Sequence, residues 1–199
     1  MFTGIVEATG TVTSVEANGT NKMVWIESPI SGELKIDQSV SHSGICLTVD
    51  ALRNGAHRVT AVAETRAKTN LDAWHKDSLI NLERCMPMNG RIDGHIVQGH
   101  VDATALCTER KDLQGSWEYR FLFDEPFAPL LIEKGSVCVN GISLTAYNVA
   151  RNAFTVSIIP YTFNHTNIHE IKKDSIVNIE WDMIGKYINR IHSLQQNVG

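Results

Sequence analysis

The sequence has few cysteines, and none of them form a C-x-x-C pair. Zinc-binding and thioredoxin-like proteins are therefore disfavoured, because both need closely spaced thiols, and no metal site is expected. Disulfides are not expected in a cytosolic protein of this size. We interpret Cys85, Cys107 and Cys138 as small buried apolar residues and consider Cys46 separately.

Long apolar runs and clustered charges are also missing. No stretch approaches the about 20 apolar residues that span a bilayer, and the N-terminus has no basic stretch followed by an apolar one. The 18 Lys and Arg residues are scattered and the formal net charge is −4, so the sequence predicts no nucleic-acid surface. We expect a cytoplasmic protein that contacts neither membrane nor nucleic acid. No dinucleotide fingerprint or phosphate-binding loop is visible.

What the sequence does contain is an internal repeat. Gly44-Ile45-Cys46-Leu47-Thr48 matches Gly141-Ile142-Ser143-Leu144-Thr145 at an offset of 97 (141 minus 44), and this offset gives 14 identities over the 40 positions 44–83. Chance would give about two or three. Residues 3–9 also align with 98–104. The repeat predicts two duplicated domains, 1–90 and 91–182, which meet at the turn-rich segment 87–94.

Each half has the pattern of an all-β domain. In the first half, β-prone segments at 5–15, 23–28, 45–49, 57–63 and 78–84 are separated by turn signals such as Asn18-Gly19 and Asn54-Gly55. Evenly spaced short strands favour a small closed antiparallel barrel over an open sheet with exposed edges. Short helical stretches are expected at 31–34, at 127–132 and after Thr65 and Thr162.

The C-terminal segment 183–199 changes period. Its apolar residues recur at spacings of one, three and four, which predicts one face of a helix: Met183, Ile184, Tyr187, Ile188, Ile191 and Leu194. A helix of about 12 residues is marginal alone, so this face must pack on something. Packing on its own barrel and contact with another subunit both remain open.

Several motifs point to a known family. The strongest is Gly94-His95-Ile96-Val97-Gln98-Gly99-His100-Val101-Asp102. Others are Met1-Phe2-Thr3-Gly4-Ile5-Val6-Glu7, Gly44-Ile45-Cys46-Leu47-Thr48, Asn140-Gly141-Ile142-Ser143-Leu144-Thr145 and Ile184-Gly185-Lys186-Tyr187. In this order, and over nearly the whole chain, the sequence resembles the riboflavin synthase family.

The resemblance implies a fold and a reaction. The fold is two tandem six-stranded antiparallel Greek-key β-barrels related by internal duplication, plus a C-terminal α-helix that joins three subunits. Each barrel binds one 6,7-dimethyl-8-ribityllumazine, and the first barrel of one subunit faces the second barrel of a neighbour. One lumazine transfers a four-carbon unit to the other, giving riboflavin and a diaminopyrimidine. No cofactor is needed, because one substrate is oxidised while the other is reduced. Association with lumazine synthase is left open.

The repeat places two different nucleophiles at equivalent positions, Cys46 and Ser143. A buried structural cysteine is the ordinary interpretation of Cys46, but the resemblance favours a functional one, either as a polar contact or as a transient nucleophile. Thr48 and Thr145 follow at equivalent positions, where they can hydrogen-bond ring heteroatoms or serve only as β-branched strand residues. The resemblance adds Ser41, Ser143 and Thr145 to the catalytic candidates.

The two histidines of the double-His motif are five residues apart. On a strand this spacing puts them on opposite faces, so a chelating pair is not expected. His100 is the leading candidate for acid–base work, because its aligned position in the first half is Ile5 and histidine as a residue type is suited to proton transfer at neutral pH.

Further residues are expected to bind the two substrates. Gly4 and Gly99 are predicted on equivalent strands, where a missing side chain lets a flat ring approach the backbone. By resemblance Lys134 reaches a neighbour's site, although a solvated loop lysine is the simpler interpretation. The full predicted set is Gly4, Ile5, Val6, Cys46, Leu47, Thr48, Thr60, Ala61, Val62, Ala63, Glu64, Thr65, Gly99, His100, Val101, Lys134, Ser143, Leu144, Thr145, Ser157, Ile158, Ile159, Pro160, Tyr161 and Thr162.

Two alternatives to the enzyme fit the sequence less well. A non-catalytic lumazine- or flavin-binding protein of the same fold would have degraded Cys and double-His motifs, whereas here both are present. The flavin domain of a reductase would be followed by a nucleotide-binding domain, for which no residues remain. Both comparisons favour the enzyme.

Overall fold

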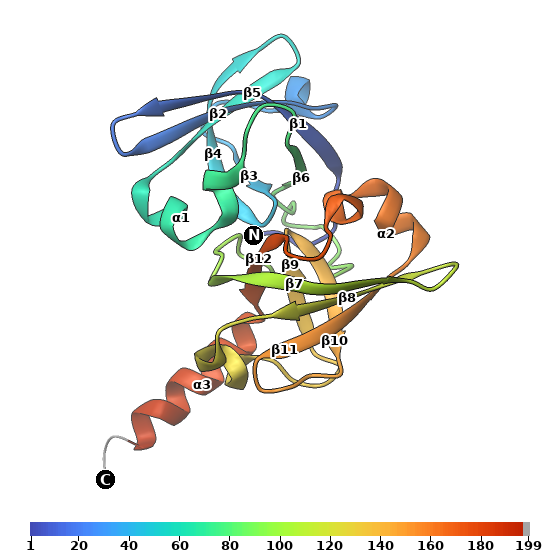
Figure 1. The fold of residues 1–199 in the computed structure, drawn as a ribbon. Coiled ribbons are helices and arrows are strands. Elements are labelled where there is room, and N and C mark those ends of the chain that lie inside the picture. Colours follow the sequence, from blue (N-terminus) through green and yellow to red (C-terminus); the bar gives the residue numbers. More distant parts are fainter. Residues whose placement is uncertain (197–199) are drawn as a thin grey trace.

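The computed structural model describes residues 1–196, which fold into two closed six-stranded antiparallel barrels followed by an α-helix. In Figure 1 the first barrel lies above the second, the N-terminus lies between them, and the last helix extends away from the second barrel. The predicted fold class is confirmed.

The two barrels have the same strand order. The first contains β1 (Ala8–Asn18), β2 (Asn21–Glu27), β3 (Ser39–His42), β4 (Ile45–Arg53), β5 (Ala56–Ala61) and β6 (Leu79–Arg84). The second contains β7 (Ala103–Asp112), β8 (Trp117–Leu122), β9 (Ser136–Val139), β10 (Ile142–Tyr147), β11 (Ala153–Ile158) and β12 (Ile176–Trp181). In the first barrel β2 pairs with β5, and in the second β8 pairs with β11. Because these paired strands are not consecutive in the chain, a longer connection crosses one end of each barrel, as in a Greek key.

The helices follow the repeat as well. They are η1 (Ser31–Glu33), α1 (Ala63–Lys68), η2 (Asn70–Ala73), η3 (Glu125–Leu130), α2 (Pro160–His165), η4 (Asn167–Glu170) and α3 (Met183–Gln196). The expected helical stretches are present. Sequence reasoning missed the short strand β3, and it started the first strand at residue 5, where the chain is still an irregular connection.

Each barrel has its own apolar core, formed by the inward faces of its strands. In β2, buried Val24 and Ile26 alternate with partly exposed Met23 and Trp25, which is the pattern of a half-buried strand. The second core is richer in aromatic rings, with Phe154 packed against both Phe121 and Trp181.

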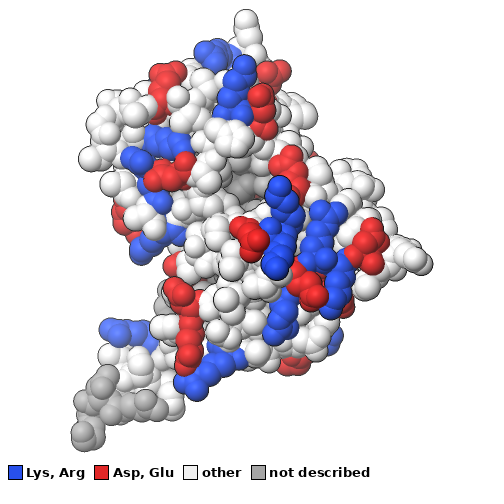
Figure 2. Space-filling view, in the orientation of Figure 1, with Lys and Arg blue, Asp and Glu red and all other residues white. Residues whose placement is uncertain are grey.

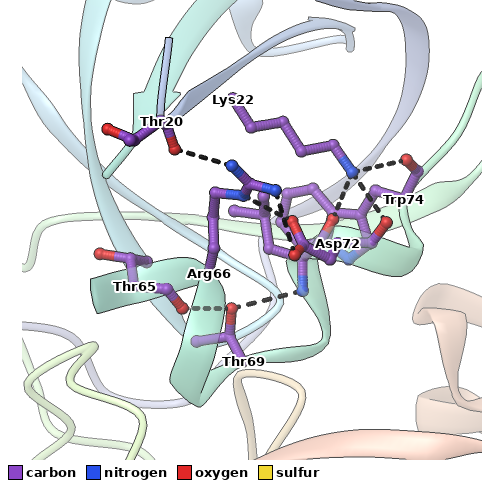
Figure 3. Close-up of polar contacts among 8 residues, drawn as sticks. Thr20, Lys22, Thr65, Arg66, Thr69, Asp72 and Trp74 are labelled. Carbon is purple, nitrogen blue, oxygen red and sulfur yellow. Dashed lines mark hydrogen bonds and ion pairs between the residues drawn. The ribbon is translucent and has the colours of Figure 1, made fainter. Parts of the chain in front are cut away.

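A helical turn closes the first barrel just beyond β5, where pocket residues are predicted (Figure 3). The buried ammonium group of Lys22 donates to the backbone carbonyls of Leu71, Asp72 and Trp74 at 2.8, 2.9 and 3.0 Å. These carbonyls lie in and just after η2, where helix-end carbonyls need partners from outside the helix; that of Leu71 also accepts from the Trp74 amide at 3.0 Å. Figure 3 also shows Arg66 joining Asp72 to the Thr20 carbonyl.

The second barrel satisfies the same three carbonyls with different side chains. The Tyr119 hydroxyl donates to the Ile168 carbonyl at 3.0 Å, and Arg110 Nη1 donates to the carbonyls of His169 and Ile171 at 3.0 and 3.3 Å. The turn geometry is therefore retained in both halves although the residues that hold it differ.

Buried asparagines join the barrels about a pseudo-twofold axis. The side-chain amide of Asn81 donates to the backbone carbonyl of Asn140 at 2.8 Å, and the equivalent side-chain amide of Asn178 donates to the backbone carbonyl of Ser43 at 2.9 Å. All four residues are buried. Ser43 and Asn140 lie in the turns that lead into β4 and β10, so this network places the two strands that carry the candidate nucleophiles.

Helix α3 leaves an apolar face uncovered. Ile184, Tyr187, Ile188, Ile191 and Leu194 are 61, 64, 63, 57 and 49% exposed. Beside the helix, a groove of about 610 Å³ is lined partly by Leu130, Ile132 and Ile188. The last three residues of the predicted segment 183–199 lie outside the described residues. Within residues 1–196 there is no helix with the length and hydropathy of a membrane span.

Candidate active site

The two halves exchange segments at the candidate site. The backbone amide of Ser143 donates to the Gly4 carbonyl at 2.7 Å, and the amide of Cys46 donates to the Gly99 carbonyl at 2.8 Å. The start of the first half thus lies on the second barrel, and the start of the second half lies on the first barrel. Val6 packs against the second core and Val101 against the first. The strand positions of Cys46 and Ser143 are therefore each contacted by backbone from the other half of the chain.

The two glycines do not lie on strands, which corrects the sequence prediction. Gly4 and Gly99 occupy bends with φ of +74° and +81°, a conformation that favours glycine. A Cβ on Gly4 would lie 2.7 Å from the Cβ of Ser143, and one on Gly99 would lie 2.6 Å from the Cβ of Cys46. The absence of a side chain therefore permits close approach to the opposite barrel.

Cys46 and Ser143 each pair across a hairpin with the other type of side chain, a hydroxyl opposite the thiol and a thiol opposite the hydroxyl. Cys46 lies opposite buried Ser41 in the β3–β4 hairpin, whereas Ser143 lies opposite buried Cys138 in the β9–β10 hairpin. Cys46 is partly buried, and burial raises the pKa of its thiol. Sequence reasoning identified Ser41, but only the pairing shows that its partner across the hairpin is Cys46.

His95, which was ranked below His100 from the sequence, is the histidine that lies beside Ser143. Its Nδ1 lies 2.6 Å from the Ser143 hydroxyl, and its side chain is 9% exposed. Burial lowers the pKa of His95, with Asp182 acting in the opposite direction, so the ring is neutral near pH 7. His100, by contrast, is exposed on the single chain. The signal in the sequence was the double-His motif itself, which did not show which ring meets Ser143.

The second barrel has an open pocket of about 620 Å³ beside Ser143. It brings together many predicted residues, namely Lys134, Ser143, Leu144, Thr145, Ser157, Ile159 and Thr162. Lys134 Nζ lies 5.0 Å from the centre of the Tyr147 ring at this pocket, in its own barrel.

Two further lining residues, Glu118 and Tyr147, were not predicted. The Tyr147 hydroxyl is hydrogen-bonded to the Glu118 carboxylate and lies 3.1 Å from the Ser157 hydroxyl. Burial and then Glu118 raise the pKa of Tyr147, so the phenol keeps its proton.

The first barrel places different polar groups at the equivalent positions. Asp50 stands where the second barrel has Tyr147, and its carboxylate accepts from Arg58 Nε at 2.6 Å and from the Thr60 hydroxyl. The equivalent positions of the two barrels therefore carry unlike hydrogen-bonding groups, a carboxylate in the first and a phenol in the second.

Not every predicted substrate-binding residue is accessible. The side chains of Ala61 and Ile158 are 1% exposed and belong to the cores, so only their backbone can contact a ligand. Their neighbours Val62, Ile159 and Tyr161 are 51, 60 and 69% exposed and form apolar rims after β5 and β11. Among the described residues, no cluster of three or more His, Cys, Asp or Glu side chains could hold a metal ion.

Comparisons with known proteins agree with this arrangement. A family model described as "Lumazine binding domain" matches residues 3–85 and 98–182, one match on each barrel. The riboflavin synthase of Bacillus subtilis is 39% identical over 199 residues, covering 99% of this chain and 93% of the relative. The riboflavin synthase of Mycobacterium tuberculosis is 38% identical over 197 residues, covering 96% and 98%.

Solved structures show the same fold. LumP complexed with riboflavin superposes with a TM-score of 0.85 at 18% identity, covering 91% of this chain and 99% of LumP. LumP complexed with 6,7-dimethyl-8-(1'-D-ribityl) lumazine superposes with a TM-score of 0.83 at 16% identity, with the same coverage.

Proposed function

The chain belongs to the riboflavin synthase family, and from this premise we propose how its two barrels divide the reaction. The family's enzymes convert two molecules of 6,7-dimethyl-8-ribityllumazine into riboflavin and 5-amino-6-ribitylaminopyrimidinedione. The observation that carries the proposal is the exchange of segments, which places the first half's residues 4–6 at Ser143 and the second half's residues 99–101 at Cys46. We take the chain as 1–90, 91–182 and 183–199, with one lumazine site in each of the first two parts.

In the second pocket, Ser143 and His95 are the proton-handling pair. A neutral His95 accepts a proton through Nδ1, and the Ser143 hydroxyl lies between that nitrogen and the pocket. We propose that this pair moves the proton that leaves the C7 methyl of one lumazine, with Thr145 as a further polar contact. Backbone groups of residues 4–6 read the pyrimidine edge.

In the first pocket, Cys46 serves as a polar contact to the ring. Its raised pKa leaves the thiol protonated near pH 7, which argues against a resting thiolate nucleophile. Ser41 supports it from the neighbouring strand, and His100 is exposed where a second ring can reach it. Holding two rings in a reactive pose can by itself lower the barrier by about 7–11 kcal/mol.

The second ring comes from another subunit. We propose a homotrimer in which α3 joins the subunits and the first barrel of one chain faces the second barrel of its neighbour. The uncovered apolar face of α3 and the exposed apolar rims at Val62 and Ile159 support this arrangement. On the face in Figure 2, acidic and basic side chains lie side by side over both barrels, so charge does not oppose association there. We place the protein in the cytoplasm and regard lumazine synthase as a separate candidate partner.

One experiment tests the reaction directly. Purified protein is incubated with 6,7-dimethyl-8-ribityllumazine alone, without added metal or nucleotide, and riboflavin is followed by its absorbance. One riboflavin per two lumazines consumed is expected. Tight binding without turnover would instead indicate a chromophore carrier, the second candidate that the shared fold with LumP raises. Co-sedimentation with lumazine synthase tests that partner.

A further inference from the structure

Two buried carboxylates hold the exchanged segments in place. Glu83 Oε1 accepts from the Thr3 amide at 2.7 Å and from the Thr3 hydroxyl at 2.8 Å, and Oε2 accepts from the Gly4 amide at 3.0 Å. The repeat partner Glu180 accepts from the amides of Gln98, Gly99 and His100 at 2.7, 2.8 and 2.8 Å. The exposed fractions of Glu83 and Glu180 are 7% and 2%.

Each carboxylate lies in one barrel but shapes the pocket of the other. Glu83 is on β6 of the first barrel, and the segment that it holds ends against Ser143 on β10 of the second. Glu180 is on β12 of the second barrel, and its segment ends against Cys46 on β4 of the first. The segments also meet each other, because Phe2 and Val97 exchange backbone hydrogen bonds of 2.7 and 3.0 Å.

The geometry requires an ionised carboxylate. Both oxygens of each side chain face N–H donors, and a carboxylate is the group that accepts at both oxygens. Burial raises the pKa of Glu83 and of Glu180, and the backbone donors act against this rise. A glutamine would keep one acceptor but turn its own NH₂ group toward a backbone N–H, which would push the segment away.

We propose that Glu83 and Glu180 are positioning residues that act crosswise, each setting the geometry of the lumazine pocket in the opposite barrel. Glu83 holds Gly4 at Ser143, and Glu180 holds Gly99 at Cys46. The catalytic consequence rests on the proposed function, whereas the structural consequence does not. The two pockets of one chain are thereby linked, since a substitution of the carboxylate in either barrel alters the pocket of the other barrel.

Hydrogen exchange with residue resolution in the full chain tests the crossed effect. In Glu83→Gln, exchange of the Ser143 amide should rise by about tenfold, because loss of a charge-assisted hydrogen bond has an effect of that size, while the Cys46 amide is unchanged. In Glu180→Gln the pattern should reverse. Glu16→Gln, a change at an exposed glutamate of β1, is the matched control and should alter neither amide.

Riboflavin formation is measured on the same variants. Both glutamine variants should lose kcat by about tenfold or more while binding riboflavin, since the ring is held less well against the reacting groups. If Glu83→Gln does not fold, Thr3→Val removes the hydroxyl contact to Glu83, together with the bond that this hydroxyl accepts from the Ile5 amide at 3.3 Å, and should raise Ser143 exchange by a smaller factor. Faster exchange confined to the mutated barrel's own strands would overturn the proposal. A wild-type chain that makes no riboflavin would refute the proposed function while the exchange pattern still decides the crossed effect.

Discussion

Gly44 and Gly141 face each other where the two barrels meet. A Cβ on Gly44 would lie 2.9 Å from the Gly141 nitrogen, and a Cβ on Gly141 would lie 2.8 Å from the Gly44 nitrogen. Both residues have positive φ, +85° and +80°. The turns that precede Cys46 and Ser143 are therefore in backbone contact, and the distance between the two sites of one chain is set there.

Replacing Gly44 by alanine should destabilise the protein more than the same change at a free turn. The positive φ costs about 1–2 kcal/mol, and the clash with Gly141 adds about 1–3 kcal/mol. Gly55→Ala is the matched control, because Gly55 has φ of +74° with nothing within 4 Å of a built Cβ. Chemical denaturation gives the free energy of unfolding of both variants. An equal loss of this free energy in the two variants would contradict the prediction, because the contact with Gly141 would then add no cost.

His95→Gln should lower kcat without unfolding the protein. The amide can still hydrogen-bond the Ser143 hydroxyl but cannot take up its proton, so we expect a loss of about 10²–10⁴ in kcat at saturating lumazine. The exposed His75→Gln is the control and should leave kcat unchanged. A wild-type kcat in His95→Gln would remove the pair from the mechanism and return the acid–base role to His100.

A row of buried, hydrogen-bonded side chains should make the stability of the first barrel sensitive to acid. His42 Nδ1 donates to the Val40 carbonyl at 2.9 Å, His42 Nε2 accepts from His57 Nε2 at 2.8 Å, and His57 Nδ1 accepts from the Ser31 hydroxyl at 2.8 Å. Only the neutral rings satisfy every bond. Burial, and for His42 also the neighbouring His57, lowers the pKa of His42 to about 3; burial lowers that of His57 to about 4.

Because these folded-state pKa values lie below the ordinary value of 6.5, the unfolded chain takes up protons first as the pH falls. The contribution of the two neutral histidines to the free energy of unfolding is therefore fully present above pH 7 and decreases below about pH 6.5. At pH 5 each histidine has lost about 2 kcal/mol of this contribution. The double variant His42→Val with His57→Phe, which copies Val139 and Phe154 of the second barrel, should lose this dependence. Chemical denaturation at pH 7 and at pH 5 gives the free energy of unfolding of each protein at the two pH values. An equal loss of this free energy between pH 7 and pH 5 in the wild type and the double variant would contradict the assignment.

A chain truncated after Asp182 should keep both barrels and lose the trimer. The apolar stripe of α3 has few contacts within its own chain, so its removal leaves the cores intact while association and riboflavin formation fall. The remaining activity should depend on protein concentration. Ile188→Glu, on the exposed apolar face, should act in the same direction as truncation, whereas Gln195→Glu, at an exposed polar position near the helix end, should not. Sedimentation is run beside the turnover assay, and a fully active monomer would refute the intersubunit site.

The sequence by itself determined the duplication, the barrel class, the final helix and the equivalence of Cys46 with Ser143. These features follow from local patterns or from a constant offset, which need no knowledge of how distant segments meet. β3 escaped detection because Ser39–His42 is short and mostly polar, and its strand conformation comes from its neighbours β4 and β6.

Only the tertiary structure decided which segments complete which pocket. Nothing in the sequence around Gly4 shows that it lies on Ser143, or that His95, and not His100, reaches that hydroxyl. The repeat aligns Glu83 with Glu180 but does not show that each holds a segment belonging to the other barrel's site. These relationships arise when the two barrels dock about their pseudo-twofold axis. The buried asparagine side chains find partners in the opposite half of the chain, whereas each carboxylate holds a segment of its own half against the other barrel.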